Sequence, residues 1–248
     1  MKIIPLSEGS FTIDKSKILI PFDSSKDILQ QRAAGSLLVE IQPFLIITEK
    51  DILLIDTGLG YADHGELQLH ANLKANGIHP DQISKVIMSH LHKDHAGGIS
   101  KRDQLGNYFP AFPKAQFYVQ KKEYEYAVET GFPSYMIEEL SVLENNPTVN
   151  WLDGNGSIDG YIFYEITGAH SPYHQVIWIK EKDEILFFGG DDAPQLQQMK
   201  SRFVAKYDFN GKLCMELRQQ WWLKAKSENW TFLFYHDIKT PCYQQKES

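Results

Sequence analysis

The chain has 248 residues, of which 42% are hydrophobic and 23% charged, and its formal net charge is −7. This balance is typical of a globular protein with a sizeable core, and the absence of a basic cluster longer than a dipeptide argues against nucleic-acid binding, which needs cations to displace counterions from phosphates. Two cysteines outside any CxxC pair exclude a disulfide framework, and no segment approaches the ~20 apolar residues of a membrane helix, so we expect a soluble, cytoplasmic protein.

The first third of the chain is predicted to be rich in strands. Ser10–Ile20 alternates between apolar and polar residues, and Gly35–Ile47 and Ile52–Asp56 are apolar runs separated by turn residues. Gly65–Asn76 is predicted to be a helix because it consists of strong helix formers and is followed by Gly77 as a stop signal.

The remainder alternates between short apolar strands and two helical segments. The predicted strands are Ile83–Met88, Ala115–Val119, Tyr161–Thr167, Gln175–Lys180, Ile185–Phe188 and Trp230–Tyr235. Helices are expected over Lys121–Glu129 and over about Lys212–Lys226. Since neither a linker nor a repeat interrupts this α/β pattern, we predict a single domain over residues 1–248. Several strands end in a histidine or aspartate, and such ends meet along one edge of a sheet.

Four side chains that can bind a metal follow the strand Ile83–Met88. They are His90, His92, Asp94 and His95. Zinc is bound by neutral imidazole nitrogen and by carboxylate oxygen. Residues two apart in an extended chain point the same way, so His90 and His92 are expected to converge on one ion, with Asp94 and His95 reaching a second. Solvated histidines before a loop are the alternative, but the density of this cluster favours a metal site.

Further ligands are expected from other strand ends, because the short segment His90–His95 does not by itself saturate two ions. The candidates are His170, Asp191 and His236, each of which follows a predicted strand. Asp192 beside Asp191 is an alternative ligand. Together with the dense cluster they give seven ligands, enough for two ions that share one carboxylate and lower the pKa of a water between them.

This pattern resembles the metallo-β-lactamase superfamily, whose signature is HxHxDH followed by a later His, Asp and His. The resemblance runs from about Ile41 to His236. It implies an αββα sandwich in which two mixed sheets are flanked by helices, with the site along one edge. It also implies a metal assignment: His90, His92 and His170 on the first of two Zn²⁺ ions, Asp94, His95 and His236 on the second, and Asp191 bridging.

Two further positions gain a role from the resemblance. Asp56 matches an aspartate that orients the ligands through hydrogen bonds. His92 stands where the oxygen-reducing diiron branch has glutamate, which favours zinc hydrolysis over redox chemistry, although other divalent transition metals are also compatible.

Within the superfamily, Ser89–Gly98 and Phe234–Asp237 resemble N-acyl-homoserine lactone lactonases, which are quorum-quenching enzymes. Gly65–His79 also resembles methyl-parathion-hydrolase-like members, which act on phosphotriesters. Several lactonases carry a tyrosine three residues after the bridging aspartate, where this chain has Pro194. Tyr207 or another aromatic residue is then expected to contact the substrate carbonyl.

The resulting hypothesis is a lactone-opening enzyme. A hydroxide between the metals attacks the ester carbonyl, with Asp94 and Asp191 as the catalytic residues and Asp94 handling a proton. Trp221 and Trp222 are candidates for an apolar wall around an acyl chain, the alternative being ordinary core packing. Other hydrolases of the same fold, acting on phosphotriesters, thioesters or β-lactams, remain open, and a non-enzymatic scaffold is disfavoured by the full ligand set. We expect a monomer or a homodimer with a small-molecule substrate, without nucleic-acid or membrane partners.

Overall fold

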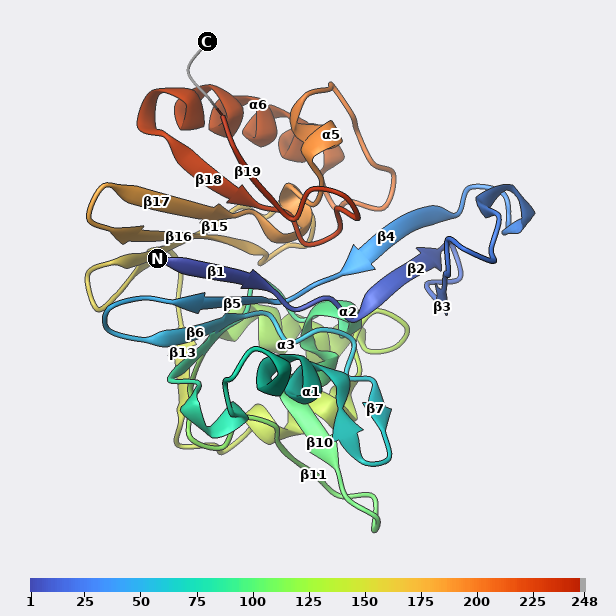
Figure 1. Cartoon of the computed structure of the whole chain (residues 1–248), viewed down its shortest axis with the longest axis vertical. Coiled ribbons are helices and arrows are strands. Elements are labelled where there is room, and N and C mark those ends of the chain that lie inside the picture. Colours follow the sequence, from blue (N-terminus) through green and yellow to red (C-terminus); the bar gives the residue numbers. More distant parts are fainter. Residues whose placement is uncertain (246–248) are drawn as a thin grey trace.

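Two six-stranded sheets are built one after the other along the chain. The computed structural model describes residues 1–245 (Figure 1). The first sheet has the order β1 (Lys2–Pro5), β5 (Phe44–Ile47), β6 (Ile52–Ile55), β9 (Lys85–Ile87), β12 (Gln116–Gln120) and β13 (Val149–Leu152). The second has the order β14 (Gly156–Ile158), β15 (Ile162–Ile166), β16 (Gln175–Glu181), β17 (Glu184–Phe188), β18 (Trp230–Leu233) and β19 (Cys242–Gln244).

The central strands are apolar throughout because both of their faces are buried. Successive side chains of a strand point to opposite faces. Leu45 and Leu54 therefore join the core beneath the helices, whereas Ile46 and Leu53 join the core shared with the second sheet. Phe188 meets this shared core from the other side. The inner faces of the two sheets pack together, which is why these strands read as continuous apolar runs.

Helices cover the outer face of each sheet (Figure 1). The α-helices are α1 (Gln68–Ala75), α2 (Lys93–Ala96), α3 (Lys121–Thr130), α4 (Ile137–Leu140), α5 (Leu196–Met199) and α6 (Gly211–Glu228). Residues of α1 and α3 pack on the first sheet, and α6 packs on the second. This arrangement confirms the predicted αββα sandwich. Of the helices within residues 1–245, none is long and apolar enough to cross a membrane.

A three-stranded arm projects from one side of the sandwich (Figure 1). It has the order β3 (Leu19–Pro21), β2 (Gly9–Ile13) and β4 (Leu37–Ile41). The prediction of one strand over Ser10–Ile20 was wrong, because Lys17 donates its backbone N–H to Asp14 O (3.0 Å) and turns the chain into a hairpin. The predicted strand Gly35–Ile47 is likewise divided into two.

Short elements complete the molecule. Two small hairpins join β7 (Ala62–Asp63) to β8 (Glu66–Leu67) and β10 (Ser100–Arg102) to β11 (Tyr108–Pro110). The 3₁₀ turns are η1 (Leu29–Gln31), η2 (Pro80–Gln82), η3 (Gly97–Ile99), η4 (Ser141–Leu143) and η5 (Gly190–Asp192). The helix predicted over Gly65–Asn76 begins later, at Gln68, because Gly65 takes a positive φ of 83° in the β7–β8 turn.

The strands that precede the candidate metal ligands run in a common direction within each sheet. β6 is parallel to β9, and β17 is parallel to β18, while β15 is separated from β17 by one antiparallel strand. Their carboxyl ends therefore reach the same edge of the sandwich, the one where α2 lies near the base of the arm (Figure 1).

Candidate metal centre

Four of the predicted ligands form a first group at this edge: His90, His92, His170 and Asp191. Each offers one ligand atom, and these atoms all lie within 4.8 Å of one another. His92 Nδ1 lies 2.9 Å from His90 Nε2 and 3.1 Å from His170 Nε2. His170 Nε2 is also 3.2 Å from Asp191 Oδ2. Three ring nitrogens and one carboxylate oxygen thus converge on one point.

Asp94, His95 and His236 form the second group. His236 Nε2 lies 3.7 Å from Asp94 Oδ2. The other oxygen of Asp191, Oδ1, lies 3.1 Å from His95 Nε2 and 3.0 Å from His236 Nε2. Asp191 therefore presents one carboxylate oxygen to each group, and the structure brings all seven predicted side chains together.

A short helix places the second pair of the motif. His92 O accepts the backbone N–H groups of His95 and Ala96, both at 2.9 Å, which starts α2 directly after the first two histidines. The turn after β6 is bonded to this helix, because Thr57 N donates to His95 O (2.7 Å) and Gly97 N to Gly58 O (2.9 Å). A Cβ on Gly97 would lie 2.4 Å from Leu59 O, so glycine permits this close approach.

Asp56 orients two of the histidines from behind. It is fully buried, its Oδ1 accepts Ser89 N (2.7 Å), and its Oδ2 lies 2.7 Å from His95 Nδ1. A carboxylate only accepts, so His95 carries its proton on Nδ1 and directs the Nε2 lone pair into the centre. Ser89 Oγ donates to Asp56 (2.6 Å) and so accepts from His90 Nδ1 (3.1 Å), which leaves His90 Nε2 free in the same way.

The Nε2 atoms of His236 and His170, the two remaining candidate ligand atoms of this kind, are oriented similarly. His236 Nδ1 donates to Glu40 O (2.7 Å), a backbone carbonyl of β4. His170 Nδ1 lies 2.9 Å from Asp208 Oδ1. No sequence pattern indicates Asp208, which follows no predicted strand and lies among exposed residues.

Buried Glu123 of α3 connects the two histidine loops. Its Oε1 accepts Leu91 N (3.1 Å), between the first two histidines, and its Oε2 accepts Ser171 Oγ (3.2 Å), next to His170. Burial raises the pKa of this carboxyl. The sequence predicts only a charged helix here, because nothing next to Glu123 in the sequence shows that its side chain faces inward.

The electrostatics of the centre are dominated by Asp191. Although burial favours its protonated form, the imidazoles of His236, His95 and His170 hold the pKa of Asp191 well below its ordinary value. Burial likewise favours neutral rings, yet attraction to Asp191 raises the pKa of His95 well above its ordinary value and that of His170 to about 9. The shared carboxylate is therefore ionised and attracts positive charge from both sides.

The arrangement fits divalent cations. Burial and neighbouring imidazoles hold the pKa of His90 and of His92 well below the ordinary value, so both rings are neutral. Their nitrogens face each other across the first group. Within residues 1–245, the buried atoms His95 Nε2 and Asp191 Oδ1 have no hydrogen-bond partner. The neutral ring nitrogens of His90 and His92 and the ionised carboxylate of Asp191 are the kinds of donor that a zinc-type site uses.

Asp192, the alternative ligand, faces away from the centre. Its carboxylate accepts His170 N (2.8 Å) and Thr167 Oγ1 (2.5 Å). Fully buried His174 accepts the backbone N–H of Asp191 at its Nε2 (3.1 Å). A Cβ on Gly190 would lie 2.6 Å from that nitrogen, so glycine is needed here for the support of Asp191.

The predicted pocket residues are distributed differently. Tyr207 is 49% exposed, and its ring centroid lies 6.2 Å from that of His170. Trp221 packs on Phe187 at 4.9 Å, and Trp222 stacks on Tyr243 at 5.8 Å, both in the core between α6 and the second sheet. The expectation that the two tryptophans wall a substrate pocket is therefore not met, because the apolar face of α6 must cover its sheet.

The sandwich and the edge of seven ligand-type side chains define a class of proteins. The chain belongs to the metallo-beta-lactamase superfamily, which its sequence matches over residues 40–203. The resemblance that the motif indicated is thus confirmed.

Curated relatives of the chain are named as lactonases. It is 31% identical over 123 residues to the N-acyl homoserine lactonase AttM of Azorhizobium caulinodans, a match that covers 44% of this chain and 41% of that protein. It is 26% identical over 218 residues to the N-acyl homoserine lactonase of Bacillus thuringiensis, with 79% of this chain and 80% of that protein covered. The chain thus matches only part of AttM but most of the Bacillus protein.

Solved structures share the fold. A probable metal-dependent hydrolase from Staphylococcus aureus superposes with a TM-score of 0.75 at 21% identity, covering 98% of this chain and 91% of that one. AidC, a dizinc quorum-quenching lactonase described in complex with its product, gives a TM-score of 0.74 at 17% identity, covering 99% and 90%. At these identities the likeness establishes the architecture.

Proposed function

We propose that the protein is a dinuclear zinc hydrolase that opens lactone rings, with N-acyl-homoserine lactones as substrates. The observation that carries the proposal is the position of Asp191, which offers one oxygen to each of two groups of ligands. His90, His92 and His170 would hold one ion, and Asp94, His95 and His236 the other. The names of the curated relatives support a lactone as the substrate.

When bound, the two ions supply Lewis acidity that lowers the pKa of water and stabilises negative charge on an ester carbonyl oxygen. Hydrolysis forms a bond from the water oxygen to the acyl carbon and breaks the bond from that carbon to the ring oxygen. Half-buried Asp94, 3.7 Å from His236 Nε2, is the group that takes the proton of the water and passes it to the ring oxygen.

The role of Asp191 is to remain ionised and fixed while charge moves. Three imidazoles lie within 3.2 Å of its two oxygens, and His174 holds its backbone N–H. Tyr207 is the aromatic side chain that would contact the substrate, because this chain has Pro194 where several lactonases have a tyrosine. Its exposed ring lies beside His170, so it would be within reach of the carbonyl of a lactone bound at the centre.

The test is hydrolysis by zinc-loaded protein of a panel of N-acyl-homoserine lactones, phosphotriesters and thioesters. We expect lactone opening, and we expect His92→Ala to abolish it, with His64→Ala as the control because His64 is exposed in the β7–β8 turn. Activity on phosphotriesters alone would refute the lactonase assignment and favour the alternative suggested by the segment Gly65–His79. Failure to bind zinc would refute the metal centre itself.

A further inference from the structure

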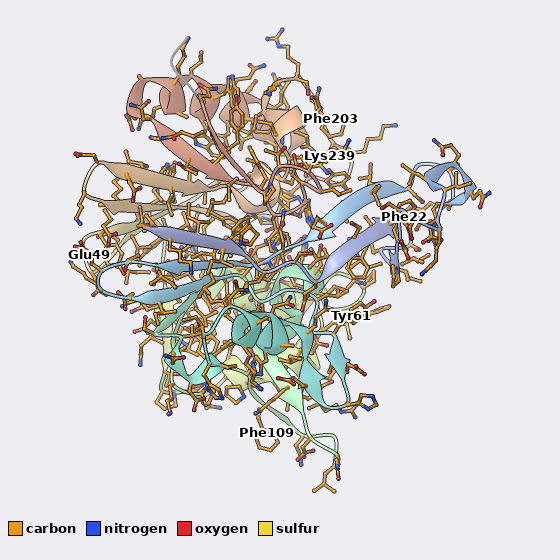
Figure 2. All side chains as sticks on the ribbon, in the orientation of Figure 1. Phe22, Glu49, Tyr61, Phe109, Phe203 and Lys239 are labelled. Atoms are coloured by element: carbon orange, nitrogen blue, oxygen red, sulfur yellow. The ribbon has the colours of Figure 1, made fainter. Side chains whose placement is uncertain are left out.

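The segment that joins α5 to α6 lies against the first group of ligands. Residues 200–210 form neither helix nor strand, and their apolar side chains Phe203, Val204, Tyr207 and Phe209 are exposed. Figure 2 shows Phe203 on the same side of the molecule as Phe22 of the arm. Because these apolar side chains are exposed, the segment gains little stability from apolar burial, and segments with few buried apolar contacts open locally at low free-energy cost.

One buried acid in this segment contacts the metal centre. The side chain of Asp208 is 2% exposed, although its two neighbours in sequence are both exposed. Its Oδ1 lies 2.9 Å from His170 Nδ1. Two backbone bonds extend the contact, because Phe209 N donates to His170 O (3.0 Å) and Asn210 N to Ala169 O (2.7 Å). The end of the segment is thus tied to the loop that carries His170.

Arg218 of α6 ties the beginning of the segment to Asp192, in the turn η5. It is 1% exposed, and it donates to Asp192 O (2.8 Å) and to Phe203 O (2.6 Å). The carboxylate of Asp192 in turn accepts His170 N (2.8 Å). Asp192 therefore holds the backbone of His170, and Asp208 holds its ring. The segment is connected to both, because it contains Asp208 and is joined to Asp192 through Arg218.

We propose that Asp208 is a positioning residue that couples metal binding at His170 to the folding of residues 200–210. The inference rests on the metal centre of the proposed function. Asp208 keeps the proton of His170 on Nδ1 and fixes the ring plane, so that the Nε2 lone pair faces the other ligands. Losing such a partner typically weakens metal binding 10–100-fold.

Coupling between two sites is reciprocal. If Asp208 increases the affinity for metal by ordering His170, then bound metal must stabilise the Asp208–His170 contact by the same factor. The segment, and with it Tyr207 beside the site, is then more ordered in the metal-loaded protein than in the metal-free protein. A substrate wall that is set in place by metal loading follows from this linkage.

The experiment compares wild type with Asp208→Asn, which keeps the shape of the side chain but removes its charge. Zn²⁺ is titrated against a chromophoric competing chelator, and hydrogen exchange of residues 200–210 is measured with and without Zn²⁺. We expect the wild type to bind two ions and to gain protection in this segment on binding. We expect Asp208→Asn to bind one of the two ions about 10–100-fold more weakly and to lose that gain.

Two further variants keep the outcome interpretable. Asp183→Asn makes the same chemical change in the exposed turn between β16 and β17, and it should behave as wild type. Asp208→Glu retains the carboxylate, so an affinity between those of wild type and Asp208→Asn is expected, and it serves as the test variant if the amide variant fails to fold. Equal zinc affinity in wild type and in the Asp208 variants would overturn the coupling while leaving the proposed function intact. Hydrogen exchange of residues 200–210 that is the same with and without zinc would do so too. A wild type that binds no zinc would overturn both.

Discussion

Glu8, between β1 and β2, is expected to make the stability of the protein depend on pH. The residue is 4% exposed, and its carboxylate Oε2 accepts Leu59 N (2.6 Å) in the turn that follows Asp56. Within residues 1–245 its buried Oε1 has no hydrogen-bond partner. Burial, opposed only in part by the bond from Leu59, raises the pKa of Glu8 from 4.5 to about 7.

The sign and size of the effect follow from this rise. Below pH 4.5 the group is protonated in both the folded and the unfolded state and contributes no difference. Between pH 4.5 and about 7 only the unfolded state releases the proton, so the free energy of unfolding falls as pH rises. Since one pKa unit corresponds to about 1.4 kcal/mol, the loss is complete above about pH 7 and amounts to roughly 3 kcal/mol.

Glu8→Gln removes the titration while keeping the shape and an acceptor for Leu59 N. We expect the free energy of unfolding of this variant, minus that of wild type, to increase by roughly 3 kcal/mol between pH 4 and pH 8. Urea unfolding followed by tryptophan fluorescence measures the difference. Glu129→Gln, on the exposed side of α3, should show no such trend. A difference for Glu8→Gln that is independent of pH would refute the reasoning.

Three further outcomes are expected. Asp56→Asn should weaken zinc binding about 10–100-fold in a calorimetric titration, because His95 and Ser89 lose a charged partner, and unchanged affinity would contradict the orienting role. Trp221→Ala should lower the free energy of unfolding by about 3–5 kcal/mol in urea with zinc affinity unaltered, so a change in affinity instead would place this residue at the site. Dialysis against a chelator should lower the Tm, and Zn²⁺ at about 100 times its Kd should restore about 2.7 kcal/mol; a Tm indifferent to zinc would speak against the centre.

Much of the architecture was predictable because both faces of the central strands are buried. The residues Ile52–Ile55 are all apolar, and such a run predicts a buried strand whatever packs on either face. The proposed ligands were indicated for a related reason. His90, Asp191 and His236 each follow an apolar strand by a few residues, so their common edge follows from the direction of the strands.

The errors and omissions have different physical causes. The alternation assigned to Ser10–Ile20 holds only from Ser10 to Ile13. The polar run Asp14–Lys17 that follows marks the reversal of the chain, and the prediction of one strand overlooked it. Asp208 and Glu123 were missed because the groups they contact lie far away in sequence, and nothing adjacent to either marks it as buried. The tryptophans of α6 were ambiguous because an apolar helix face suits a sheet as well as a ligand.

The division of the strands between the sheets has a consequence for how the molecule is held together. Residues up to Leu152 build one sheet and supply His90, His92, Asp94 and His95, whereas residues from Gly156 build the other and supply His170, Asp191 and His236. Neither half owns a complete set of donors. A chain nicked at residues 153–155 is therefore expected to behave as two complementing fragments whose apolar inner faces associate. Added zinc should strengthen this association, because it would bind side chains of both fragments.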